Sequence, residues 1–288
     1  MKDAVYQVIT DRVITLLEQG TIPWHKPWRG GDTMPQNLVS RRPYRGVNVF
    51  MLHTVAYESP FWLTFKQAKE MGGNVRKGEH ACPVVFWKWL GVDESEAAGQ
   101  RPVPMLRYYS VFNVAQCDGV TAPATEGTDH EHSPIETAEQ IVAAMPKRPE
   151  IRHGLDRAFY SPAADSVGMP SPERFETPEN YYSVLFHELT HSTGHESRLN
   201  RKGVSGSESA GFGSQSYSKE ELVAEMGAAF LCGRAGIVER TIDNSAAYVA
   251  SWLERLKDDA RLIVLAAAQA QKAADFILGA SEREEAAQ

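Results

Sequence analysis

Two histidines and a glutamate near residue 190 have the spacing of a metal-hydrolase site. Residues 187–191 read His-Glu-Leu-Thr-His inside an apolar stretch that is typical of a helix. On a helix, His187 and His191 lie one turn apart on the same face, so both imidazoles can bind one cation. Glu188 lies beside them in the sequence and is the candidate catalytic residue, a general base acting on a bound water. The spacing therefore predicts a metal site with hydrolytic chemistry.

A third protein ligand is expected downstream, because hydrolytic zinc sites usually have three and leave a fourth position for water. His195 follows a glycine that is typical of a helix end, so we expect it to support the site or the fold and not to bind the metal. Residues 218–231 favour a second helix. There Ser218 and Glu221 have the spacing of a capping box, whereas Glu225 lies among apolar residues, where an ionised carboxylate is costly unless it binds a cation. We predict Glu225 as the third ligand and keep Glu221, one turn earlier, as the alternative.

The bulk composition is ordinary for a globular protein. The chain has 288 residues, of which 42% are hydrophobic and 23% charged, and no stretch reaches the roughly 20 apolar residues of a membrane span. The N-terminus lacks the apolar centre of a signal peptide, and the three cysteines form no Cys-x-x-Cys pair. We therefore expect a cytoplasmic protein with no membrane contact, long enough for two domains.

The net charge of −7 is unevenly distributed along the chain. Residues 1–120 carry 14 Lys and Arg against 11 Asp and Glu, and the rest carries 16 against 26. Only the first part can attract a polyanion. Five of the six tryptophans lie in the first 90 residues and are interleaved with basic residues. Cations neutralise phosphates and aromatic rings stack on unpaired bases, which is the chemistry of single-strand binding.

This mixture of aromatic and basic residues has two interpretations, a nucleic-acid surface or an aromatic core with a solvated basic rim. Phe86 and Phe112, on predicted strands, favour the core. Trp24 and Trp28 lie in a loop between prolines and favour stacking on bases. The candidate DNA-binding residues are Trp24, Lys26, Trp28, Arg29, Arg41, Arg42, Tyr44, Arg45, Trp62, Lys66, Arg76 and Lys77.

The helices and strands that must position these residues are predicted from sequence patterns, and together they indicate an α+β protein of two domains. A mixed N-terminal domain is expected over 1–120, a linker rich in turn formers over 121–134, and a mostly helical C-terminal domain with a small sheet over 135–288. Helices are predicted over 3–19, 65–71, 134–145, from Thr177 through the histidine motif, over 218–231 and within 248–278. Strands are predicted over 84–89, 106–115, 158–160 and 166–169.

Several motifs occur in a specific order along the chain. They are Gly-Thr-Ile-Pro-Trp-His-Lys-Pro-Trp at 20–28, Tyr-Arg-Gly-Val-Asn at 44–48, Trp-Leu-Thr-Phe-Lys-Gln-Ala at 62–68, Gly-Gly-Asn-Val-Arg-Lys-Gly-Glu at 72–79, Val-Phe-Asn-Val-Ala-Gln-Cys-Asp-Gly at 111–119, and the stretches 187–195 and 220–225. The first five resemble the N-terminal domain of ArdC-type plasmid antirestriction proteins. The last two resemble the zincin-like metallopeptidase domain of the same family.

The resemblance implies a protein that binds single-stranded DNA and protects incoming plasmid DNA from host restriction endonucleases during conjugation. Its gluzincin-type site would hold Zn²⁺ or another divalent metal such as Mn²⁺. The partners would be single-stranded DNA and, for the metal domain, host restriction enzymes or another protein substrate. The alternative is a DNA-recruited zinc metalloprotease that cleaves a host protein. The sequence leaves open whether the metal domain is a working peptidase.

Overall fold

The computed structural model divides into two units, each discontinuous in sequence. The residues that it describes are 2–24, 34–55, 57, 59–90, 103–123, 134–201, 203–204, 215–237 and 246–280. Unit 1 comprises Met1–Pro23, Thr33–Glu126 and Val249–Val264, and unit 2 comprises Trp24–Asp32, Gly127–Tyr248 and Leu265–Gln288. The units differ from the predicted contiguous domains, because residues 24–32 group with unit 2 and residues 249–264 with unit 1.

Unit 1 is built on a four-stranded sheet in the order β1-β2-β5-β4. β1 runs parallel to β2, and the other neighbours are antiparallel. Valines and aromatic residues dominate the long strands, as strand propensity requires. A separate ribbon pairs β3 with β6. The strands are β1 (Gln36–Asn37), β2 (Phe61–Thr64), β3 (Asn74–Val75), β4 (Cys82–Leu90), β5 (Val103–Asn113) and β6 (Cys117–Asp118), with a 3₁₀ turn, η1 (Val114–Gln116), before β6.

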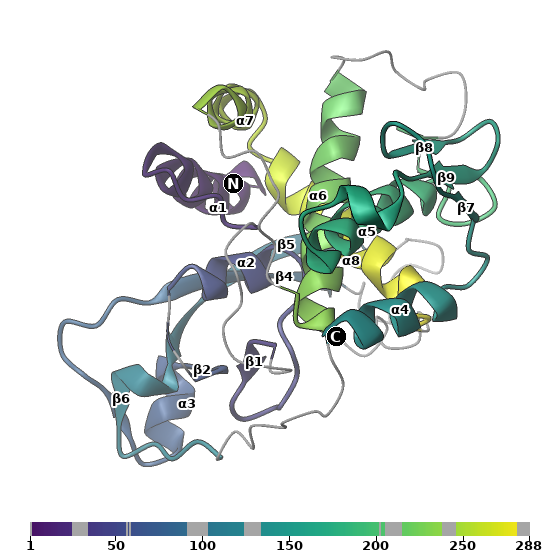
Figure 1. Cartoon of the computed structure of the whole chain (residues 1–288). Coiled ribbons are helices and arrows are strands. Elements are labelled where there is room, and N and C mark those ends of the chain that lie inside the picture. Colours follow the sequence, from purple (N-terminus) through teal and green to yellow (C-terminus); the bar gives the residue numbers. More distant parts are fainter. Residues whose placement is uncertain are drawn as a thin grey trace, which may run out of the picture. The chain divides into compact units, whose positions relative to one another are not determined.

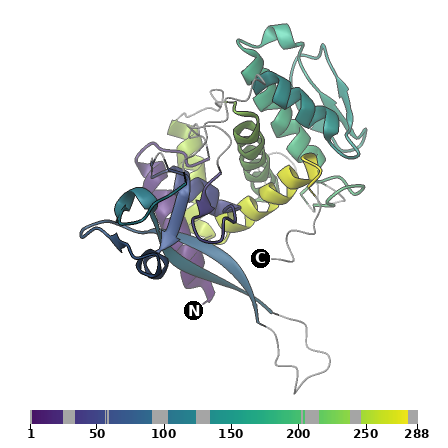
Figure 2. The ribbon, with the colours of Figure 1, turned by 90° about the horizontal axis from the view of Figure 1, so that it is seen from below.

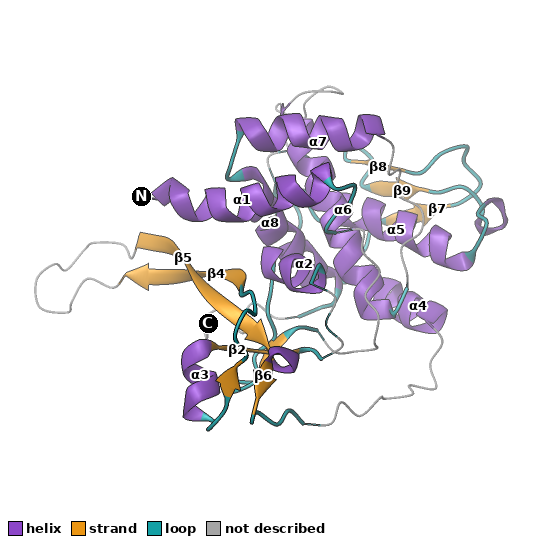
Figure 3. Ribbon diagram, turned by 90° about the vertical axis from the view of Figure 1, so that its left-hand side faces the viewer, coloured by secondary structure: helices purple, strands orange, loops and turns teal. Residues whose placement is uncertain are grey.

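The helices of unit 1 are α1 (Lys2–Glu18), α2 (Val47–His53), α3 (Phe65–Glu70) and α7 (Ala246–Asp258). Three of them, α1, α2 and α3, pack against this sheet, and α7 lies beside α1 (Figure 3). The hydroxyl of Thr10 in α1 donates a 2.7 Å hydrogen bond to the carbonyl of Ala260, and Lys257 lies 3.4 Å from Glu18. These contacts explain why a segment near the C-terminus belongs to the N-terminal unit.

Unit 2 combines helices with a three-stranded sheet in the order β7-β9-β8 (Figure 1). β7 runs parallel to β9, and β8 runs antiparallel to it. The elements are α4 (Pro134–Ala144), β7 (Glu150–Arg152), β8 (Phe159–Ser161), β9 (Ser166–Gly168), the 3₁₀ turn η2 (Pro172–Arg174), α5 (Pro178–Ser192), α6 (Gln215–Ala235) and the part of α8 (Leu262–Ile277) that follows residue 264. α5 packs along α6.

The α+β class and the predicted helices and strands are confirmed. The sequence did not predict α2 or the short strands β1, β2, β3, β6 and β7, and it started α6 three residues too late. Those strands have two to four residues each, too few to establish a period of two. Among the described residues, no helix is both long and apolar enough to cross a membrane.

Candidate metal centre

The two histidines of the motif lie on α5, whose start is fixed by local signals. The hydroxyl of Thr177 caps the helix by accepting a hydrogen bond from the backbone N–H of Asn180, and Pro178 occupies the first turn. The helix places His187 and His191 one turn apart on one face, with their Nε2 atoms 3.1 Å from each other. The predicted pair of ligands is therefore brought together.

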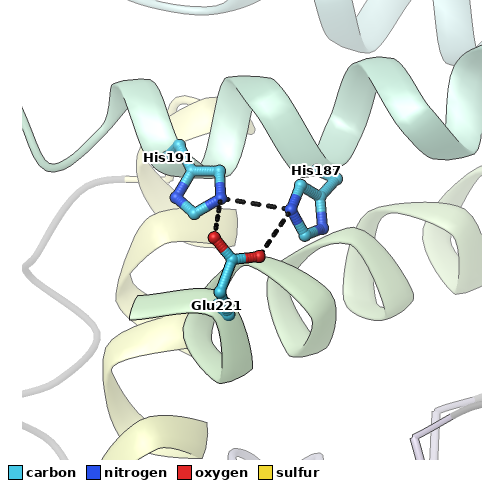
Figure 4. Close-up of side chains that lie close together, drawn as sticks. All are labelled: His187, His191 and Glu221. Carbon is cyan, nitrogen blue, oxygen red and sulfur yellow. Dashed lines mark hydrogen bonds and ion pairs between the residues drawn. The ribbon is translucent and has the colours of Figure 1, made fainter. Parts of the chain in front are cut away.

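Glu221 of α6 completes a group of three donors with these histidines (Figure 4). Its Oε2 lies 3.5 Å from Nε2 of His187, and its Oε1 lies 3.5 Å from Nε2 of His191. Ligand atoms about 2.0–2.2 Å from a tetrahedral ion lie about 3.2–3.6 Å from one another. The donor types and their separations thus fit a divalent metal ion.

The electrostatics of the group also suit a cation. Burial lowers the pKa of His187, but its hydrogen bond to Glu221 and the nearby carboxylates of Glu188, Glu221 and Glu225 raise that pKa to about 9 overall. The carboxylates around His187 therefore favour a positive charge at this position. A metal ion would neutralise the charge of the same carboxylates.

The structure places Glu221, not the predicted Glu225, beside the two histidines. α6 already includes Gln215, so Ser218 lies inside the helix and not at its N-cap. Glu225 is 7% exposed, and its Oε2 accepts a 2.8 Å hydrogen bond from Nε1 of Trp24. The buried carboxylate is therefore stabilised by an indole N–H, and the alternative ligand is the one that the geometry supports.

Glu188 and Glu220 are two further buried carboxylates next to the donors. Glu188, the predicted general base, is 9% exposed and lies on α5 between the two ligand histidines. Oε1 of Glu220 lies 3.4 Å from Nδ1 of His191. A carboxylate at the outer ring nitrogen fixes the orientation of a ligand histidine, which leaves Nε2 for the metal.

Arg201 holds Glu220 in this position. Its Nε donates to Oε2 of Glu220 at 3.0 Å, and its Nη2 donates to the carbonyl of Thr190 at 2.8 Å. Burial raises the pKa of Glu220, but the hydrogen bonds from His191 and Arg201 outweigh burial and lower it overall. The sequence analysis identified neither Glu220 nor Arg201 as part of the site. The one local pattern that could have indicated Glu220 is its position next to Glu221 in the sequence.

His195 lies outside the group of three donors, as the sequence predicted. Its Nδ1 is 2.8 Å from the hydroxyl of Ser197 and 4.0 Å from Asp165. Ser197 lies in the turn that follows α5, and Asp165 lies between β8 and β9. His195 therefore has a structural position in the described part of the chain.

The predicted nucleic-acid residues that the structure describes differ in burial. Trp24 and Trp62 are only 1% and 2% exposed, so both are core residues and neither presents a ring to a base, contrary to the prediction. Tyr44 and Arg45 are half-buried. Lys66 pairs with Glu70, and Arg76 with Glu79 and Asp118. Arg41, Arg42 and Lys77 are exposed; Lys26, Trp28 and Arg29 lie outside the described residues.

Comparisons with known families assign both parts of the chain. Residues 3–112 match the N-terminal domain of anti-restriction factor ArdC, and residues 136–269 match a zincin-like metallopeptidase family. The crystal structure of the antirestriction protein ArdC from plasmid R388 in its metal-free form is 39% identical, with a TM-score of 0.74 over 98% of this chain and 97% of that one. Its Mn(II)-bound form gives a TM-score of 0.75 over 96% and 97%.

Similar proteins of known sequence are of two lengths. Protein y4eC of Sinorhizobium fredii is 36% identical over 95% of this chain and 91% of its own. Two DNA primases named TraC from Escherichia coli are 36% and 33% identical over 99% and 98% of this chain. The chain spans only 28% and 20% of those two primases.

Proposed function

The chain belongs to the ArdC family of antirestriction proteins, and we propose that it binds single-stranded DNA and protects incoming plasmid DNA from host restriction endonucleases during conjugation. The observation that carries this proposal is the correspondence with the R388 protein over nearly the full length of both chains. The excess of basic residues in the first 120 positions agrees with a polyanionic partner. On this proposal the protein acts in the cytoplasm, where an entering strand meets restriction enzymes.

The proposal for the metal centre is that His187, His191 and Glu221 hold zinc or another divalent ion such as manganese. When bound, such an ion supplies a Lewis acid and makes water acidic enough to attack a carbonyl near neutral pH. Glu188 would accept the proton of that water and hold it on its carboxylate. Glu220 keeps His191 oriented, and Arg201 keeps Glu220 in place.

A second candidate function is a DNA-recruited metalloprotease that cleaves a host protein. Two histidines, a ligand carboxylate and a buried glutamate next to the first histidine are the set that peptide hydrolysis requires. If the protein only shields DNA, Glu188 has no chemical task.

The variant Glu188→Gln separates the two candidates, because it removes the base and keeps the ligands. We expect it to retain metal, single-strand affinity and protection of a transferred plasmid in a restricting recipient. Glu196→Gln, an exposed glutamate beyond the end of α5, is the matched control. Loss of protection by Glu188→Gln alone, with metal and DNA binding intact, would establish the protease. A wild-type chain that does not bind single-stranded DNA would refute the main proposal.

A further inference from the structure

A stacked aromatic pair with one exposed ring lies on the β4–β5 hairpin of unit 1. The rings of Phe86 and Tyr109 are stacked with centroids 4.2 Å apart and an angle of 4° between their planes. Tyr109 is 53% exposed and Phe86 is half-buried. The sequence had favoured Phe86 as a core residue and Trp24 as a stacking residue. In the structure Trp24 is 1% exposed and therefore buried, whereas Phe86 is only half-buried.

The register of the hairpin sets which residues share a face with this pair. Phe86 is paired with Arg107 and Tyr109 with Val84, so Phe86, Arg107 and Tyr109 project from the same face. Trp87 and Tyr108 project from the opposite face. There Tyr6 of α1 contacts Trp87 edge to face, with ring centroids 6.4 Å apart.

α1 therefore packs against one face of the hairpin. The opposite face is buried at Cys82, Val84 and Val111 and carries exposed side chains at Arg107 and Tyr109. Figure 3 shows α1 along one side of β4 and β5, and Figure 2 shows the same hairpin from the side opposite α1. In this stacked pair Phe86 is half-buried and Tyr109 is exposed. A third planar ring can extend the stack at the exposed ring.

The positive charge of β4 and β5 favours an anionic partner. β4 and β5 contain Lys88 and Arg107 and no Asp or Glu. Arg107 is exposed and forms no ion pair with any residue that the structure describes. The guanidinium of Arg107 can contact a phosphate, and the neighbouring aromatic pair offers a surface on which a base can stack.

We propose that Phe86, Arg107 and Tyr109 form a platform for single-stranded DNA, in which one base stacks on the ring pair and Arg107 contacts a phosphate. The platform rests on the proposed function, since it names the site through which single strands bind. It differs from the DNA-binding residues predicted from sequence. Of those that the structure describes, Trp62 projects from the same face of the sheet, because it pairs with Asn113, but it is only 2% exposed. Stacking on a ring is tolerant of base identity, as binding to any entering strand requires.

The test is fluorescence anisotropy of the full chain with a labelled oligothymidylate. Tyr109→Ala should weaken binding by about tenfold, and Tyr109→Phe, which keeps the ring, should bind like the wild type. Arg107→Gln should flatten the slope of log affinity against log salt by about 0.7, the value for one phosphate contact on a single strand. Tyr108→Ala is the matched control, because Tyr108 is the neighbouring tyrosine, is 50% exposed and projects from the opposite face.

The outcomes distinguish the platform from the proposed function. If the wild type binds and Tyr109→Ala binds equally well, or if Tyr108→Ala loses as much affinity, the platform is wrong while single-strand binding stands. If the wild type does not bind, the proposed function itself fails. Unchanged thermal unfolding of each variant excludes a loss of affinity through misfolding.

Discussion

Nε1 of Trp24 donates a 2.8 Å hydrogen bond to Oε2 of Glu225, a residue 201 positions further along the chain. The two side chains are 1% and 7% exposed, so the bond is made away from solvent. We predict that Trp24→Phe lowers the free energy of unfolding by about 2–3 kcal/mol, because it removes both the donor and part of a core side chain. Denaturant unfolding measures this change.

The same variant tests the stacking role that the sequence suggested for Trp24. At temperatures where the variant is folded, its affinity for single-stranded DNA should equal that of the wild type. A fall in affinity with unchanged stability would contradict the buried position of the indole.

Glu221 and Glu225 provide a second prediction, because they lie one turn apart on α6 and only Glu221 meets the histidines. Glu221→Gln should weaken Zn²⁺ or Mn²⁺ binding by more than about a hundredfold, since loss of a ligand exceeds the 10–100-fold effect of losing a supporting partner. Glu225→Gln keeps an acceptor for Trp24 and should retain the metal. Metal content after dialysis and calorimetric titration check both, and the reverse result would restore Glu225 as the ligand.

The part of the site that the sequence predicted depends on local signals. The cap at Thr177 and the spacing of His187 and His191 act within one helix. The start of that helix and the position of both histidines on one face could therefore be predicted from the sequence. The third ligand depended on where α6 begins, and Ser218 matched a capping pattern that the longer helix overrides.

The errors of the sequence analysis concern partners that are distant in the chain. A buried carboxylate implied a cation, but its partner was the indole of Trp24, which no local pattern could identify. The stacking roles of Trp24 and Trp62 failed for the same reason, because burial is decided by tertiary packing. Phe112 does pack against the core of unit 1, as predicted, whereas Phe86 is half-buried and stacks on the exposed ring of Tyr109.

Gly227 of α6 gives a third prediction, because it lies against Thr190 of α5. A β-carbon at this position would lie 2.7 Å from Oγ1 of Thr190 and closer still to its methyl group. Gly227→Ala should therefore push α6 away from α5, lower the free energy of unfolding by about 1–3 kcal/mol and weaken metal binding. Chemical unfolding and metal titration measure the two effects.

The double variant Gly227→Ala with Thr190→Ala is the control for this steric argument. Removing the threonine hydroxyl and methyl group should recover part of both losses, which gives a favourable coupling in a double-mutant cycle. Additive losses would show that the two helices do not meet through this contact.

Asp165 gives a pH-dependent prediction. Its carboxylate accepts hydrogen bonds of 2.8 and 3.0 Å from Arg198 and of 2.8 Å from the hydroxyl of Tyr160. Burial raises the pKa of Asp165, but these hydrogen bonds outweigh burial and hold it below its usual value of 3.8. Because the folded-state pKa is depressed, the stabilisation is complete above the unfolded-state pKa and is lost as the pH falls through the folded-state value.

Asp165→Asn isolates this contribution. The position has a positive φ of 44°, which asparagine tolerates, so the variant changes the charge without new backbone strain.

Near pH 7 Asp165→Asn should lower the free energy of unfolding by about 1–3 kcal/mol, since Arg198, whose side chain is 2% exposed, loses its anion. Below about pH 4 the difference from the wild type should shrink. Asp156→Asn, which removes a fully exposed carboxylate that pairs with Arg174, should change stability by less than about 0.5 kcal/mol at any pH. A difference between wild type and Asp165→Asn that persists undiminished in acid would mean that the hydrogen bonds of Asp165 do not depend on its charge.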